Sequence, residues 1–130
     1  MSLIDPVAGA FTQIRNAANS AQQELTIQQG SNFLGELLKL MKENEYIEDY
    51  SREQEKNVAK FKVKLNGKIN DCKAIKPRYA VTKDEYEKFE KRYLPARDVG
   101  LIIVSTSQGI MTHKDAKQKK IGGRLIAYLY

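Results

Sequence analysis

The most apolar stretch of the chain is Leu101–Val104, and it ends in three consecutive hydroxyl residues, Ser105–Ser107. A short, unbroken apolar run bounded by turn residues predicts a strand that is buried on both faces. Gly109 allows the chain to reverse, and residues 110–112 are expected to return as a second strand. The pattern therefore predicts a rigid hairpin with a small polar tip, which offers many hydrogen-bond donors and acceptors in little volume.

In the first half of the chain, apolar residues three and four positions apart predict two amphipathic helices. The first is expected over about 6–20, because Asp5 followed by Pro6 is typical of a helix start. The second is expected from Ser31, acting as N-cap, to about Asn44. Alternating or β-prone segments predict strands at 25–28, 46–50 and 59–65. The predicted order of this half is α-β-α-β-β.

Two turns are predicted around the third of these strands. The polar run 52–57 is expected to be the turn that precedes it, and Asn66–Gly67 is a typical hairpin sequence that follows it. Residues 68–76 are then expected to form the partner strand of that hairpin and to lead into the second half of the chain.

The second half is predicted to be mostly antiparallel β with short helices. A capping-box sequence at 82–85 predicts a helix that Pro95 ends. A short basic helix, whose cap is a threonine, is expected over 114–120 and is expected to end at Gly122–Gly123. Residues 124–130 are predicted to form the closing strand.

These elements favour an α+β fold of two small lobes, with residues 1–67 as an N-terminal α/β lobe and 68–130 as a basic, β-rich C-terminal lobe.

No long apolar stretch indicates a membrane span, and the N-terminus lacks the pattern of a signal peptide. The single cysteine, Cys72, excludes an internal disulfide framework and fits a reducing compartment.

The net charge of +6 is unevenly distributed. Residues 1–66 contain 8 Lys/Arg and 9 Asp/Glu, whereas residues 67–130 contain 14 Lys/Arg and 7 Asp/Glu. A half this basic favours a polyanionic partner, most often nucleic acid, and an ordinary solvated surface accounts for the charge equally well. Lys60, Lys62 and Lys64 share one face of a predicted strand, where they suit either phosphate contact or edge protection.

Few residues are suited to catalysis or to metal binding. His113 is the only histidine, and a pair with Ser105 or Ser107 has neither a G-x-S-x-G elbow nor a marked carboxylate to orient the imidazole. One Cys and one His without ligand spacing do not predict a metal site, and phosphate-binding glycine motifs are not found. We therefore expect no catalytic residue, no metal, no cofactor and no small-molecule substrate.

A nucleic-acid interface accounts for more of these features. A-form RNA offers 2′-hydroxyls and base edges in a wide, shallow minor groove or at bulges. Small Ser and Thr side chains, and bare backbone at Gly122–Gly123, reach such edges where bulky cations do not. Lys and Arg around them would bind phosphates and make the affinity depend on salt.

Motifs along essentially the whole chain resemble, in collinear order, those of one family. The C-terminal ones are S-T-S-Q-G-I-M-T at 105–112, Ala116 and G-G-R-L-I at 122–126. The earlier ones are I-R-N-A at 14–17, Tyr46–Ile47, N-x-C-x-x-I-x-P-R-Y at 70–79 and L-P-x-R at 94–97. Together they resemble small-subunit ribosomal protein eight.

The resemblance implies a cytoplasmic, structural constituent of the small ribosomal subunit that takes part in translation. It implies a primary binder of small-subunit rRNA that recognises a bulged helix in the central domain and helps to assemble the platform. The implied partners are that RNA and other small-subunit ribosomal proteins. The residues that the resemblance assigns to RNA contact are Ser105, Thr106, Ser107, Gly109, Gly122, Gly123 and Arg124, with Arg15, Asn16, Ser31 and Asn32 in the N-terminal lobe.

Two features depart from the bacterial pattern of this family. Pro77–Arg78 stands where the bacterial loop usually has Pro-Gly, and the helix predicted within 82–93 is longer than the bacterial segment. Both resemble the archaeal and eukaryotic branch. Bacterial members also repress their own messenger RNA, and these departures leave that role open for this chain.

Three alternatives remain open from the residues. A free-standing double-stranded-RNA binder or messenger-RNA regulator would use the same surface, but only a ribosomal protein should co-sediment with small subunits. A Ser/His hydrolase would need His113 within hydrogen-bond reach of Ser105 or Ser107, backed by a carboxylate. A protein–protein adaptor would use Tyr128 and Tyr130, and its binding should depend little on salt.

Overall fold

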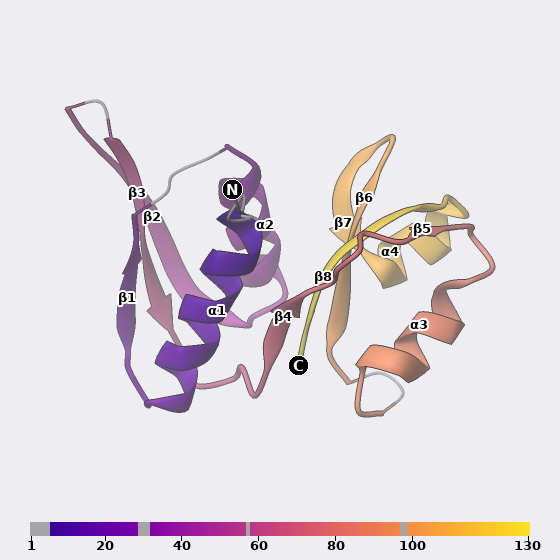
Figure 1. The fold of residues 1–130 in the computed structure, drawn as a ribbon, viewed down its shortest axis with the longest axis horizontal. Helices are drawn as coiled ribbons and strands as arrows, with labels where there is room; N and C mark the ends of the chain where they lie inside the picture. Colours follow the sequence, from indigo (N-terminus) through magenta and orange to yellow (C-terminus); the bar gives the residue numbers. More distant parts are fainter. Residues whose placement is uncertain (1–5, 29–31, 57, 97–98) are drawn as a thin grey trace. The chain divides into compact units, whose positions relative to one another are not determined.

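The computed structural model describes residues 6–28, 32–56, 58–96 and 99–130. The chain divides into two compact units, Met1–Asp71 (unit 1) and Cys72–Tyr130 (unit 2). Each unit has its own antiparallel sheet with helices packed on it, which confirms the predicted α+β fold (Figure 1). In the part of the chain described, no helix is long and apolar enough to cross a membrane.

Unit 1 has the predicted α-β-α-β-β order. Its elements are α1 (Pro6–Asn19), β1 (Glu24–Ile27), α2 (Asn32–Glu43), β2 (Ile47–Glu55) and β3 (Val58–Leu65). The strands lie in the order β1-β3-β2. The helical spacing of Val7, Phe11 and Ile14 puts these side chains on the buried side of α1, and alternation buries Phe61 and Val63 of β3. The predicted helix caps at Asp5 and Ser31 lie outside the described residues.

Two predictions about the strands of unit 1 are wrong. The polar run 52–57 was expected to be a turn, but β2 continues through its first four residues, with Arg52 opposite Phe61 and Glu55 opposite Val58. The turn falls at Lys56, and residue 57 lies outside the described residues. An edge strand tolerates such polar residues because its outer side faces solvent. Residues 68–76 do not pair with β3, because β1 and β2 already occupy both of its edges.

Unit 2 is built around a five-stranded sheet. Its elements are β4 (Cys72–Ala74), β5 (Ala80–Val81), α3 (Tyr86–Tyr93), β6 (Leu101–Thr106), β7 (Gly109–Thr112), α4 (His113–Lys119) and β8 (Gly123–Leu129). The strand order is β4-β8-β6-β7, and β5 also pairs with β8. Strand β6 is central, and Leu101–Val104 are buried on both of its faces, as the sequence predicted.

Local hydrogen bonds set the ends of the two helices of unit 2. The Thr82 N–H donates to the Glu85 carboxylate at 2.8 Å, which is one of the two hydrogen bonds of a capping box. The predicted helix start at Thr82 is nevertheless wrong, because the Glu85 N–H donates to the Thr82 carbonyl and makes 82–85 a turn, after which α3 begins. The Asp115 N–H donates to the Thr112 hydroxyl at 3.2 Å and caps α4. The expectation that Gly122–Gly123 ends α4 is wrong, because Lys120 adopts the left-handed conformation that closes the helix.

Candidate nucleic-acid interface

The hydroxyl tip (residues 105–109) joins β6 to β7, and its turn is fixed by the side chain of Thr106. The Thr106 hydroxyl donates to the Gly109 carbonyl at 2.7 Å and accepts from the Gln108 N–H at 3.1 Å. Gly109 has a φ of +111°, which favours glycine. The Ser107 side chain is exposed, whereas that of Ser105 is half-buried. Thr106 therefore shapes the turn, and Ser107 presents its hydroxyl to solvent.

The sheet brings the hydroxyl tip and the Gly-Gly-Arg segment together. Ser105 pairs with Ile110 on β7 and, across its other edge, with Arg124 on β8. Arg124 pairs in turn with Ala80 on β5 and has an exposed side chain. Two motifs that are separate in the sequence thus form neighbouring strand ends in unit 2.

Gly122 and Gly123 are required by close packing within the sheet. A Cβ atom on Gly122 would overlap the carbonyl oxygen of Val81, and one on Gly123 would overlap the carbonyl oxygen of Ser105. Both neighbours are backbone atoms, which move only if a strand shifts. These glycines therefore hold β8 against β5 and β6, and this packing positions Arg124 beside the tip.

Of the predicted site residues in unit 1, Arg15 and Asn16 lie on α1. Both side chains are exposed, and the Nε atom of Arg15 lies 2.8 Å from the Oδ1 atom of Asp71. The ion pair fixes the direction of the guanidinium group without burying it. Arg15 therefore remains within reach of solvent anions, in competition with Asp71.

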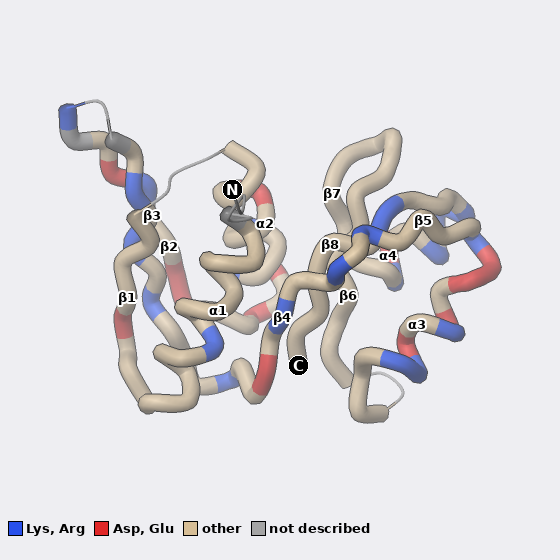
Figure 2. The backbone as a smooth tube through the Cα atoms, viewed as in Figure 1, with Lys and Arg blue, Asp and Glu red and all other residues tan. Residues whose placement is uncertain are grey.

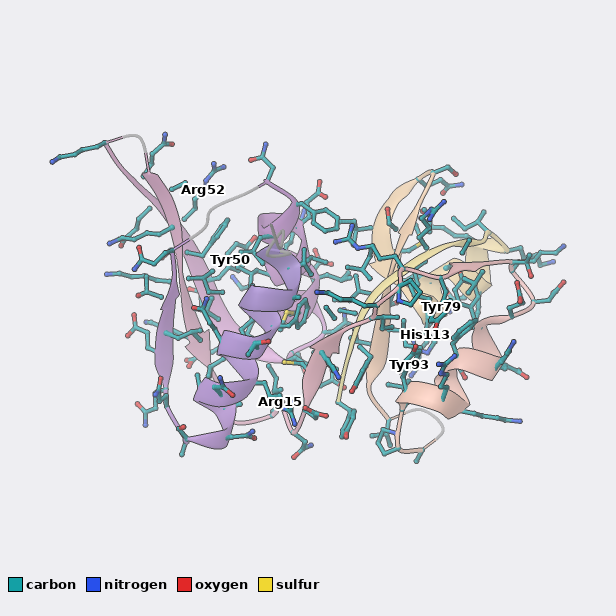
Figure 3. The ribbon with its side chains drawn as sticks, viewed as in Figure 1. Arg15, Tyr50, Arg52, Tyr79, Tyr93 and His113 are labelled. Atoms are coloured by element: carbon teal, nitrogen blue, oxygen red, sulfur yellow. The ribbon has the colours of Figure 1, made fainter. Side chains whose placement is uncertain are left out.

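Asn32 lies elsewhere in unit 1, at the start of α2. Its Oδ1 atom accepts a hydrogen bond from Nη1 of Arg52 at 3.0 Å. Figure 3 shows Arg52 and Arg15 toward opposite ends of unit 1. The predicted residues of this unit therefore occupy two separate places, and Ser31 lies outside the described residues.

Basic residues are concentrated in unit 2, but not at the hydroxyl tip. Unit 2 contains 13 Lys/Arg and 6 Asp/Glu, and Figure 2 shows Lys and Arg on α3, α4 and the β5 edge while the β6–β7 turn has none. In unit 1, Lys60 and Lys62 lie 3.8 and 3.3 Å from carboxylate oxygens of Glu53. The alternating lysines of β3 are thus partly offset by acids on β2, so unit 2 is the stronger candidate for a polyanion.

His113 is buried and has a structural role. Its Nδ1 atom accepts a hydrogen bond from the Ile102 N–H at 3.0 Å, next to the Ile103–Thr112 pair at which the β6–β7 pairing ends. Its Nε2 atom lies 3.2 Å from Oε1 of Glu90. Burial lowers the pKa of His113, although the negative charge of Glu90 opposes this effect. Because both ring nitrogens are engaged by groups other than Ser105 and Ser107, the arrangement argues against a Ser–His nucleophile.

The sequence did not single out a cluster of rings and cations on α3, which we call the α3 platform: Tyr79, Lys88, Phe89, Arg92 and Tyr93. The guanidinium carbon of Arg92 lies 5.3 and 5.4 Å from the ring centroids of Tyr79 and Tyr93. The Nζ atom of Lys88 lies 5.6 Å from the ring centroid of Phe89. Helical spacing places Lys88 beside Arg92, but no sequence signal brings Tyr79 to them.

Among the described residues, no group of three or more His, Cys, Asp and Glu side chains is placed to hold a metal ion.

A comparison with protein families matches residues 5–130 to the family described as Ribosomal protein S8. The match spans both units and all the motifs on which the resemblance rests, whereas the assignment to the archaeal and eukaryotic branch stays a prediction. The partners of this family are small-subunit rRNA and other ribosomal proteins. The chain therefore belongs to the ribosomal protein S8 family and is an rRNA-binding constituent of the small ribosomal subunit in the cytoplasm.

Proposed function

We propose that the hydroxyl tip recognises a bulged helix in the central domain of small-subunit rRNA, and that the chain thereby helps to assemble the platform of the subunit. The observation that carries the proposal is the pairing of Ser105 with Arg124, which puts uncharged hydrogen-bonding groups and a cation at neighbouring strand ends. An RNA bulge exposes base edges and 2′-hydroxyls close to phosphates, so a binder needs both kinds of group together.

In this proposal some residues of the tip contact the RNA and others hold the turn in shape. Ser107 is exposed and both donates and accepts, so it suits a base edge or a 2′-hydroxyl. Ser105 adds a second hydroxyl, while Thr106 and Gly109 keep the turn in one conformation before RNA binds. A site that is already ordered loses less conformational entropy on binding. Arg124 then binds a phosphate, and Gly122 and Gly123 serve the site indirectly, by holding β8 close to β5 and β6 so that Arg124 lies beside the tip.

Arg15, Asn16 and Asn32 make secondary contacts with neighbouring RNA in this proposal. Arg15 must exchange Asp71 for a phosphate, which reduces its net contribution. The Oδ1 atom of Asn32 is engaged with Arg52, so its amide NH2 group is the part that would contact RNA. We propose RNA binding without catalysis, supported by the engagement of both nitrogens of His113 with Ile102 and Glu90.

The test compares Ser107→Ala with a matched control, Ser51→Ala, at an exposed serine of β2. Filter-binding titrations measure the affinity for a central-domain fragment that contains the bulged helix and for an unrelated duplex of equal length. We expect Ser107→Ala to cost about 1–3 kcal/mol of binding free energy for the fragment only, the usual scale for a base-edge contact. Ser51→Ala should change neither affinity.

Equal losses for both RNAs on Ser107→Ala would contradict recognition through the tip. Co-sedimentation of the wild-type chain with small subunits separates the ribosomal role from that of a free-standing RNA binder or messenger-RNA regulator. A chain that binds the fragment selectively but never enters subunits would refute the assembly role and support that alternative.

A further inference from the structure

We propose that the α3 platform is a second RNA-binding surface, separate from the hydroxyl tip, in which Arg92, assisted by Lys88, binds RNA phosphates. RNA as the partner follows from family membership. Figure 3 shows Tyr79 and Tyr93 of this platform on the side of unit 2 that carries α3.

Arg92 is oriented by aromatic rings and leaves its hydrogen-bonding groups unused. Its contacts within the described residues are those with the rings of Tyr79 and Tyr93, and it makes no hydrogen bond or ion pair there. The guanidinium group has five N–H donors in one plane, which match the oxygens of a phosphate. Contact with two rings restricts the long side chain, so less freedom is lost when an anion binds.

The two sides of α3 differ in charge. Lys88 and Arg92 are four residues apart and share the platform side. From α3 itself, two acids and one base, Glu87, Glu90 and Lys91, line a groove of about 650 Å³ between α3 and α4. Lys114 and Lys117 of α4 also line this groove, and Lys117 pairs with Glu90. The charge of Glu85 does act on Lys88, but its carboxylate is engaged by the Thr82 N–H. The platform side is therefore the more positive side of the helix.

The platform and the hydroxyl tip use opposite faces of the sheet of unit 2. The Tyr79 carbonyl accepts the Leu125 N–H at 2.9 Å, and the next residue, Ala80, pairs with Arg124. Successive side chains of an extended segment point to opposite faces, so Tyr79 packs on the face of the buried Leu125, whereas Arg124 shares the other face with its partner Ser105. The platform is therefore a separate place at which RNA phosphates would be bound.

The experiment compares Arg92→Gln with Lys91→Gln. Both changes remove one positive charge from α3, but Lys91 lines the groove on the other side of the helix. Filter binding is measured over a series of KCl concentrations for the bulged-helix fragment and for the unrelated duplex. We expect Arg92→Gln to weaken binding of both RNAs by roughly 5- to 10-fold near ~0.1 M salt and to reduce the salt slope by about one. Lys91→Gln should weaken either RNA by about twofold or less.

Thermal unfolding checks that each variant is folded, and Arg92→Lys provides a second test. Lysine keeps the charge without the planar stack, so it should restore the salt slope and only part of the affinity. Equal effects of Arg92→Gln and Lys91→Gln would overturn the proposal, as would an unchanged affinity. A loss of affinity with an unchanged salt slope would indicate a stacked base instead of a phosphate and would also overturn it.

The outcome is independent of recognition through the tip. If Ser107→Ala has no selective effect while Arg92→Gln weakens both RNAs, the proposed role of the tip fails and the platform stands. If Ser107→Ala acts selectively while Arg92→Gln changes nothing, the platform fails and the role of the tip stands.

Discussion

Replacing His113 tests whether its imidazole is a buried acceptor that must stay neutral. The Ile102 N–H that donates to Nδ1 belongs to a residue with 0% of its surface exposed. In His113→Leu this donor has no partner, and an unsatisfied buried N–H costs about 1–3 kcal/mol. Glu90 keeps its 2.8 Å contact with Lys117, so we expect little further loss. In His113→Asn, Oδ1 can take the place of Nδ1, and the cost should be smaller.

The same residue predicts how stability depends on pH. Burial lowers the pKa of His113 from its ordinary value of 6.5, Glu90 opposes this, and Lys117 and Lys114 add to it. Well above pH 6.5 the imidazole is neutral in both the folded and the unfolded chain. Below that pH the unfolded chain takes up a proton that the folded chain does not. The free energy of unfolding should therefore decrease by up to about 1.4 kcal/mol per pH unit, until the pH reaches the folded pKa.

The assay is urea unfolding followed by circular dichroism between about pH 7.5 and pH 5, the range in which histidine titrates. The chain has one histidine, so the difference in slope between the wild type and His113→Asn isolates this group. Hydrogen exchange at the Ile102 amide gives a local measurement, and the amide should exchange fastest in His113→Leu. Identical pH slopes in wild type and His113→Asn, or an Ile102 amide equally protected in all three proteins, would refute the reasoning.

Two further changes separate the geometry of the site from its chemistry. Thr106→Val removes the hydroxyl that bonds Gly109 and Gln108, so the free energy of unfolding in urea should decrease by about 1–2 kcal/mol. Filter binding should show a weaker affinity for the bulged-helix fragment. Unchanged stability and affinity would contradict the role of Thr106 in the turn. Gly123→Ala forces a Cβ against the Ser105 carbonyl and should destabilise the chain by about 1–3 kcal/mol, whereas Gly9→Ala in α1, where nothing lies within 4 Å, should stabilise it by about 0.5–1 kcal/mol. Similar melting temperatures for these two glycine variants would show that β8 shifts freely.

Side-chain periodicity predicted the elements that bury one face, because a regular element packed on a core repeats its apolar residues at the period of that element. The apolar run 101–104 and the stripe of α1 are such cases, and both were placed correctly. Residues 52–55 were misassigned to a turn because a polar edge strand and a turn have similar compositions. Their strand character comes from pairing with β3, which is a property of the tertiary structure.

The sequence predicted the position of the hairpin turn at the tip, but not the residues that lie beside it on neighbouring strands. The three hydroxyls looked equivalent in the sequence, whereas the structure uses Thr106 within the turn and exposes Ser107. The neighbourhood of Ser105 and Arg124 depends on strand order, which spacing along the chain does not specify. The platform likewise depends on a ring outside α3, that of Tyr79, which the pairing of β5 with β8 holds in place beside the helix.

The separation of charge from the hydroxyl tip has a physical consequence for specificity. A cation attracts every phosphate with similar energy, so a lysine at the tip would stabilise correct and incorrect RNAs alike. Hydroxyls hold only those groups that meet their geometry, and the loss of one such bond is not replaced by a phosphate elsewhere. In the proposed interface, Ser107 lies at the turn and Arg124 on a neighbouring strand, so different residues would discriminate between RNAs and attract them. A mutation at a hydroxyl position should therefore change the ratio of the affinities for the correct and the unrelated RNA. A mutation at a cationic position should weaken the binding of both RNAs and reduce its dependence on salt, so the salt series distinguishes the two.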